Sequence, residues 1–173
     1  AKAESIAANS PVTNRIAPVR ESLEATGAQT IALTYNADIE ASAISGGISQ
    51  FSINIGSISS VQISSKVVTI TISGNSFDAT DAITLLYTAD LSVQNKFLAT
   101  EGGGVAPNFA PQSVTNKVPP ALVSKNVTSV RLIALEYNVP LTAANMGTGK
   151  AQFIVKIDGT AVGNANIDSV TFS

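Results

Sequence analysis

A fixed spacing of 102 residues separates similar stretches of this 173-residue chain. Val12-Thr13-Asn14 recurs as Val114-Thr115-Asn116, and Ile31–Asn36 recurs as Ile133–Asn138 with a single difference. Self-similarity at one period indicates a structural unit that is copied along the chain. The fold to be explained is therefore that of a unit of about 100 residues, which is a common size for one small domain.

The repeat divides the chain into three parts. Residues 11–56 and 113–158 share 16 identities in 46 positions. Pro18 and Pro119-Pro120 follow the repeated Val-Thr-Asn, and proline ends strand pairing and stiffens a junction. We predict three segments: residues 1–15, the closing strand of a preceding repeat; residues 16–117, a complete β-sandwich repeat; and residues 118–173, the first half of a following repeat.

Alternation of apolar and polar residues with period two predicts β-strands within the unit. Ser and Thr make up 36 of the 173 residues, so each strand has one apolar and one hydroxyl-rich face. Short helical turns are expected over residues 18–25 and 38–45. The pattern favours an all-β fold, an immunoglobulin-like antiparallel β-sandwich in tandem repeat. The expected strands are Ile31–Asn36, Phe51–Ile55, Val61–Ile63, Val67–Ser73 and Ile83–Thr88.

Several residues have expected structural roles. Tyr87 is interpreted as a corner tyrosine whose hydroxyl ties down a connection. Asn14 and Asn116 are expected to hydrogen-bond the turn between units. Surface apolar residues at the unit ends are expected to pack against neighbouring units; these are Ile16, Val118 and Leu122.

Composition excludes several functional classes. The chain has no Cys, His or Trp, so it can form no disulfide, no thiolate or imidazole metal site and no Ser-His-Asp or Cys-His set. The net charge of −2 argues against a nucleic-acid partner. The apolar runs are far shorter than the roughly 20 residues that a membrane span needs. We expect no enzymatic activity.

Asp78 and Asp81 are the candidate metal ligands. They lie three residues apart among Ser and Thr oxygens, and Ca²⁺ binds clusters of oxygen ligands. The alternative is an Asx-type turn before the strand at Ile83, which turn preferences favour by about four to one. No other cofactor is expected.

Two short segments of the chain resemble the sequence of a known protein family. The Leu86-Tyr87-Thr88 step and the closing Gln112–Asn116 are similar to the repeat of bacterial, notably cyanobacterial, cell-surface swimming-motility (SWM) proteins. The resemblance covers residues 18–116 and recurs in 120–173. It implies a secreted or surface-displayed tandem-repeat protein with a spacer, adhesive or motility-associated role. It implies no catalytic site.

We therefore predict a non-enzymatic structural module of a long bacterial surface protein, located outside the cell. Its expected partners are neighbouring repeats or identical chains. The chain is interpreted as a window from a longer tandem array, since equivalents of residues 65–102 are missing at both ends. One alternative is a filament subunit completed by strands from neighbouring chains. Another is a carbohydrate-binding module, which the threonine-rich strand face at Thr69 and Thr71 suggests. Its expected partners are cell-surface glycans.

Overall fold

A computed structural model describes residues 15–40, 44, 47–93, 95–129, 131–141, 153–157, 159–162 and 170. The chain divides into two compact units, Ala1–Pro119 (unit 1) and Pro120–Ser173 (unit 2). Within the described residues every regular element is a β-strand except one 3-10 turn, η1 (Gly47–Gln50). The prediction of an all-β fold is confirmed. Each unit is described by itself below.

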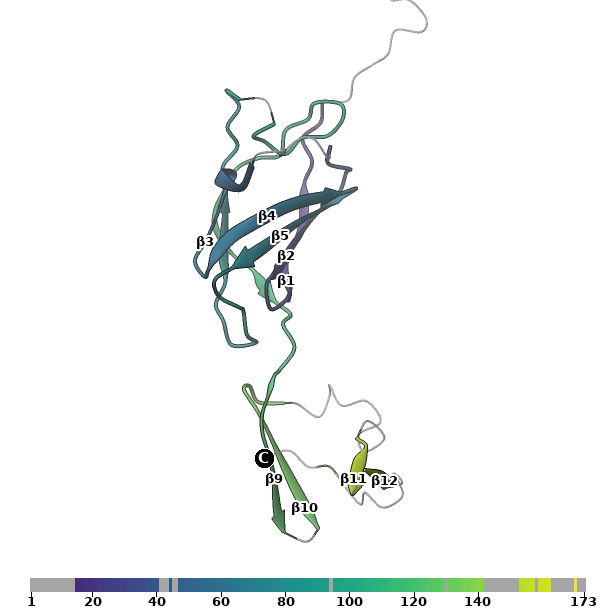
Figure 1. Cartoon of the computed structure of the whole chain (residues 1–173). Helices are drawn as coiled ribbons and strands as arrows, with labels where there is room; N and C mark the ends of the chain where they lie inside the picture. Colours follow the sequence, from purple (N-terminus) through teal and green to yellow (C-terminus); the bar gives the residue numbers. More distant parts are fainter. Residues whose placement is uncertain are drawn as a thin grey trace, which may run out of the picture. The chain divides into compact units, whose positions relative to one another are not determined.

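Unit 1 contains a five-stranded sheet, called sheet A here, in the order β4-β5-β2-β1-β8 (Figure 1). Neighbouring strands are antiparallel, except that β8 runs parallel to β1. The sequence alternation explains the sheet: apolar side chains of β2 and β5 point to one face and are buried, while their threonines lie on the other face. Its strands are β1 (Arg20–Gly27), β2 (Thr30–Tyr35), β4 (Ser57–Ser64), β5 (Val67–Ser73) and β8 (Thr115–Asn116).

A second sheet of unit 1, sheet B, has the order β3-β6-β7 and is antiparallel throughout. Its strands are β3 (Phe51–Ile53), β6 (Thr84–Tyr87) and β7 (Phe109–Ser113). Phe51, Tyr87 and Phe109, one from each strand, stack side by side with ring centroids 5.0 and 5.7 Å apart. Tilted ring pairs at this spacing stabilise a core beyond the area that they bury.

Both sheets contribute to one hydrophobic core. Leu33 and Ile70 of sheet A and Leu85 of sheet B are fully buried members of the same cluster. Arg20 of β1 links the two sheets at the core's edge. Its guanidinium lies 4.3 Å from the Phe109 ring centroid and donates a hydrogen bond to Gln112 of β7.

The expected helical turn over residues 18–25 is wrong, because these residues enter β1. Glu21, Glu24 and Ala25 are compatible with a helix, but intrinsic propensity is a weak prior against tertiary pairing. β1 pairs along its length with β2 and buries Leu23 and Ala25 against the core. Of the second expected turn, residues 38–40 and 44 are not helical, and the remainder lies outside the described residues.

Unit 2 contains two two-stranded antiparallel sheets, β10-β9 and β11-β12. The β11–β12 hairpin turns at Gly159, whose φ of 81° suits glycine. The strands are β9 (Leu122–Ser129), β10 (Leu132–Tyr137), β11 (Val155–Ile157) and β12 (Thr160–Val162).

The β9–β10 hairpin has the same strand register as the β1–β2 hairpin, advanced by 102 residues. All six Cα partner pairs of β1–β2 correspond to pairs of β9–β10, and the two irregularities fall at equivalent places. The closing hydrogen bonds correspond as well. The Val19 amide donates to Asn36 Oδ1 at 2.8 Å, and the Ala121 amide donates to Asn138 Oδ1 at 2.8 Å. The register and the asparagine hydrogen bond at the open end are therefore alike in the two hairpins.

Candidate functional site

The Asp78–Asp81 segment forms a tight, internally hydrogen-bonded turn. Asp78 Oδ1 accepts hydrogen bonds from both the amide and the hydroxyl of Thr80, and Asp81 Oδ2 accepts one from the Asp78 amide at 2.8 Å. The Thr80 hydroxyl is the main reason why the pKa of Asp78 lies below its ordinary value. These bonds are those of the Asx-type turn considered from the sequence.

Among the described residues, no group of three or more Asp and Glu side chains lies close enough to hold a metal ion. A Ca²⁺ ion takes six to eight oxygen ligands, and three of the oxygen contacts made by Asp78 and Asp81 go to the turn's own hydrogen-bond donors. The arrangement is suited to orienting the chain into β6.

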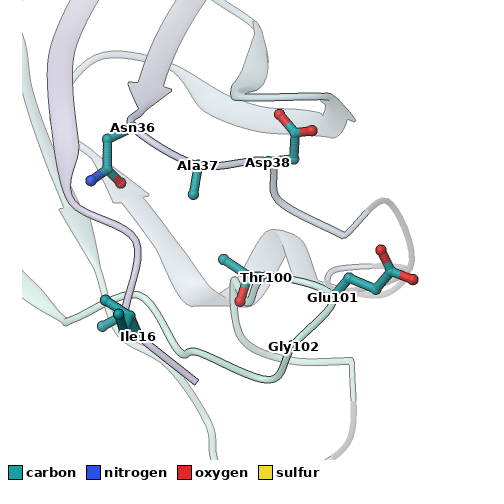
Figure 2. A pocket seen from close by; sticks show the side chains of 8 residues that line it. Ile16, Asn36, Ala37, Asp38, Thr100, Glu101 and Gly102 are labelled. Atoms are coloured by element: carbon teal, nitrogen blue, oxygen red, sulfur yellow. The ribbon is translucent and has the colours of Figure 1, made fainter. Parts of the chain in front are cut away.

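An open hollow of about 320 Å³ lies beside Ile16 and Ala17 in unit 1 (Figure 2). Among its polar side chains, Asn36 caps the β1–β2 hairpin, and Asp38 Oδ1 accepts a hydrogen bond from the Ser65 hydroxyl at 2.7 Å. Figure 2 shows Asp38 and Glu101 projecting from different sides of the hollow, without a common point between them. The lining therefore does not converge on a bound group. It comprises Ile16, Ala17, Asn36, Ala37, Asp38, Thr100, Glu101 and Gly102.

The Tyr87 hydroxyl ties down a connection, as predicted from the sequence. This buried hydroxyl accepts a hydrogen bond of 2.6 Å from the Leu98 amide, eleven residues along the chain. The bond holds Leu98 beside the end of β6. Burial raises the pKa of Tyr87, and burial with the nearby Tyr87 raises that of Tyr35.

Asn116 holds the end of unit 1 in the manner expected for the turn between units. Its Oδ1 accepts from the Val118 amide at 3.0 Å, and its Nδ2 donates to the carbonyls of Asp78 and Asp81 at 2.7 and 3.1 Å. Asn14, for which the same role is expected, lies outside the described residues. Val118 was expected to be a surface residue at the end of the unit, and this prediction is wrong, because Val118 is a buried member of the unit 1 core. Ile16 and Leu122 are exposed, as expected.

The pairing of β8, which contains Asn116, with β1 is a contact that local sequence patterns do not reveal. Thr115 and Asn116 pair in parallel with Glu24 and Ala25 of β1. The Lys117 amide then donates to the Ala25 carbonyl at 3.0 Å, and Lys117 Nζ lies 2.7 Å from Glu24 Oε1. The only signal for this pairing is the recurrence of Val-Thr-Asn at a fixed distance from β1 and β9.

An exposed apolar face is the other candidate interaction surface. Val127, Ile133 and Leu135 of the β9–β10 hairpin are 76%, 47% and 38% exposed. Their equivalents in β1–β2 are Ala25, Ile31 and Leu33, all of which are fully buried in unit 1. We call these three side chains of unit 2 the β9–β10 apolar face. Lys125 stands where β1 has the buried Leu23 and is a departure from this pattern.

Comparison of the chain with protein families, curated proteins and solved structures finds no match. Among the described residues, no helix is sufficiently long and apolar to cross a membrane.

Proposed function

We propose that the chain is a non-enzymatic structural module, an immunoglobulin-like β-sandwich unit copied in tandem in a bacterial cell-surface protein. Its role would be extension and contact, as a spacer, in adhesion or in motility, in line with the resemblance to SWM repeats. The observation that supports it most is the shared register of the β1–β2 and β9–β10 hairpins at the 102-residue spacing. Repeats that contact only their neighbours build elongated molecules.

The arrangement at the unit boundary also supports this role. Asn116 fixes the last strand of unit 1 to the Asp78–Asp81 turn, and Pro119-Pro120 follows directly. Two consecutive prolines restrict φ and keep a short connection stiff. A stiff connection transmits the direction of one unit to the next, which is what a spacer requires.

Small-angle scattering on chains that contain one, two and three copies of residues 16–117 tests the proposal. An elongated array predicts that the maximum dimension increases by a constant step with every added copy, while the cross-section stays constant. A maximum dimension that grows only with the cube root of the mass would indicate a compact globule and would contradict the proposal. Antibody labelling of intact source cells tests the surface location, and labelling only after lysis would contradict it.

A further inference from the structure

We infer that β4 of unit 1 pairs edge to edge with β4 of a second copy, antiparallel, around a two-fold axis at Gln62. In this pairing Ser60 lies opposite Ser64 of the second copy, Val61 lies opposite Ile63, and Gln62 lies opposite its own counterpart. The inference goes beyond the proposed function, which concerns copies along one chain, because it names a contact between two separate chains.

β4 lacks the protection that the other described sheet edges of unit 1 have. β4 and β8 are the edges of sheet A, and β3 and β7 are those of sheet B (Figure 1). β3 and β8 have only three and two residues, and β7 contains Pro111. β4 has eight residues, with no proline and no charged side chain. Natural edge strands use shortness, proline and charge to prevent pairing, so β4 is open to an added strand.

The open part of β4 is the stretch Ser60–Ser64. An irregularity between Ile58 and Ser60 interrupts the pairing with β5, and such a bulge hinders pairing at the outer edge as well. From Ser60 to Ser64 every residue pairs with β5 in succession, and no described residue pairs with the opposite edge. In an antiparallel strand alternate residues direct their backbone groups away from the partner. This stretch therefore presents backbone groups that no described strand pairs.

The sequence of this stretch is complementary to itself. Ser-Val-Gln-Ile-Ser has the same order of polar and β-branched apolar residues in both directions. An antiparallel pair about Gln62 therefore sets apolar side chains opposite apolar ones on the core side of the sheet, and polar side chains opposite polar ones on the outer side. A two-fold interface requires such self-complementarity, since each of its contacts occurs twice.

The absence of charge also favours a second copy as the partner. A charged side chain on the two-fold axis would face its own counterpart, and like charges directly opposite each other destabilise a strand pair. Gln62 instead sets two amide groups opposite each other, and each amide can both donate and accept a hydrogen bond. A shift by one residue would set core-side residues of one copy opposite outer-side residues of the other, so such a shift is disfavoured.

The pairing would also cover apolar surface at the edge of unit 1. Val61 and Ile63 are half-buried and pack against the core, whereas Gln62 and Ser64 are exposed. A strand added beside them would shield their outer sides from water. The chain enters sheet A at β1 and leaves it at β8, at the opposite edge from β4. The contact therefore uses neither connection of unit 1 along the chain.

One such contact is small. The stretch Ser60–Ser64 buries far less than the roughly 1,200 Å² of a specific, stable interface, so we expect single units to associate weakly and only at high concentration. Chains that carry several copies of unit 1 would be held by several contacts at once. Such multivalency raises the overall affinity by about 10²- to 10⁴-fold.

Disulfide trapping tests the pairing in the 173-residue chain, which has no cysteine of its own. Gln62→Cys should form a disulfide-linked homodimer under mild oxidation, because paired Cα atoms of antiparallel strands lie about 4.5–5.5 Å apart, within the range of a disulfide. Ser60→Cys and Ser64→Cys should each form little homodimer, since the two copies of either residue would lie about 14 Å apart. A mixture of these two variants should form the heterodimer.

Thr69→Cys is the matched control for random collision. Thr69 pairs with Gln62 across β4 and β5, one strand further from the edge, and its two copies would lie about 14 Å apart across the axis. We expect at least about ten-fold less homodimer from Thr69→Cys than from Gln62→Cys. Equal yields from these two variants would overturn the inference. So would a Ser60→Cys homodimer as abundant as the mixed heterodimer.

Charge variants test the two-fold axis without cysteine chemistry. Gln62→Lys or Gln62→Glu alone sets like charges opposite each other, and each should self-associate about two- to five-fold more weakly than the wild type at low salt. A mixture of the two variants sets opposite charges together and should restore the association in sedimentation equilibrium. A mixture that associates no more tightly than either variant alone would contradict pairing about Gln62.

Amide exchange distinguishes a second copy from other occupants of the β4 edge. In the dilute wild-type chain the β4 amides that point away from β5 should exchange rapidly, and they should become protected as the concentration rises. Protection that is already complete in the dilute monomer would assign the edge to another segment of the same chain. Exchange that stays rapid at millimolar concentration would leave the edge to an unrelated partner or to solvent. Either result would overturn the inference.

Discussion

Tyr87 shows how one side chain can tie sheet B of unit 1 to a connection. Its ring stacks between Phe51 and Phe109 of sheet B, while its hydroxyl accepts the Leu98 amide. Because the site is buried, this amide has no access to water if the hydroxyl is removed. The ring and the hydroxyl therefore contribute separately, the first through packing and the second through a satisfied hydrogen bond.

Tyr87→Phe should keep the packing and lose the hydrogen bond. An unsatisfied buried donor costs about 1–3 kcal/mol, so we expect the free energy of unfolding of unit 1 to fall by about that amount. Urea denaturation measures the loss, and amide exchange at Leu98 locates it. Tyr35→Phe is the control, because it also removes a hydroxyl from a buried tyrosine but should leave Leu98 exchange unchanged. Unchanged Leu98 exchange in Tyr87→Phe would contradict this role.

The two buried tyrosines also predict alkaline instability. Burial raises the pKa of Tyr35 and of Tyr87 above the ordinary value of about 10. Above that pH the unfolded chain releases phenolic protons that the folded chain retains, so folding stability decreases as pH rises. Below about pH 10 the two groups are neutral in both states and exert no such effect.

We therefore expect the thermal unfolding midpoint of the chain to fall steadily above about pH 10. Thermal melts at a series of pH values measure this decline. Phenolate absorbance should develop for these two tyrosines together with unfolding. Tyr35→Phe with Tyr87→Phe should flatten the alkaline decline relative to the wild type. A decline of equal slope in the double variant would assign it to other groups.

Gly104 is needed for close approach of two backbone segments. A Cβ at this position would collide with the backbone carbonyl of Ile16. Gly104→Ala should thus destabilise unit 1 by about 1–3 kcal/mol, in the range of overpacked sites. Gly27→Ala is the matched control, since a Cβ there meets nothing within 4 Å. Equal melting temperatures for the two variants would contradict the close approach.

At the scale of elements, β8 depends on one asparagine more than on its own length. It has two residues, too few to hold an edge by backbone bonds alone. Asn116→Ala would remove the hydrogen bonds to Val118, Asp78 and Asp81. We expect the Lys117 amide, which bonds to β1, to exchange at least about ten-fold faster, as for the loss of about 1.4 kcal/mol. Asn116→Asp, which keeps the acceptor, should have a smaller effect. Unaltered exchange in Asn116→Ala would contradict the anchoring role.

Elements with strict alternation could be predicted from the sequence. Val67–Ser73 is β5 in full, since its β-branched residues alternate and its ends are turns. β1 was not predicted, because Glu21, Glu24 and Ala25 suit a helix as well and pairing with β2 decides the outcome. The parallel β8–β1 pairing joins residues about 90 positions apart, which no local pattern encodes.

The candidate sites, like the strands, could be predicted where they depend on residues close together in the sequence. The Asp78 turn and the Tyr87 hydroxyl contact are local or nearly so, and residue type with position indicated both. The β9–β10 apolar face could not be predicted from composition, since Ile133 and Leu135 have the same sequence context as the buried Ile31 and Leu33. Only the neighbours supplied by the fold distinguish a core position from an exposed one.

At the scale of the whole molecule, the two units share a hairpin but differ in what surrounds it. In unit 1 the hairpin is extended by β5 and β8 and joined by sheet B in one core. In unit 2 no strand of the described residues extends β9–β10. The proposal that the chain is built from copies thus depends on the hairpin itself, its register and its closing asparagine.

Cross-strand nuclear Overhauser contacts in the 173-residue chain test that correspondence most directly. The account predicts contacts between Ser22 and Thr34 and, in the same spectrum, between Ser124 and Glu136, with both asparagine-capped ends closed. A β9–β10 hairpin shifted by even one residue would turn its apolar face to the opposite side. Such a shift, or helical contacts over residues 122–137, would contradict the claim that the chain repeats one structural unit.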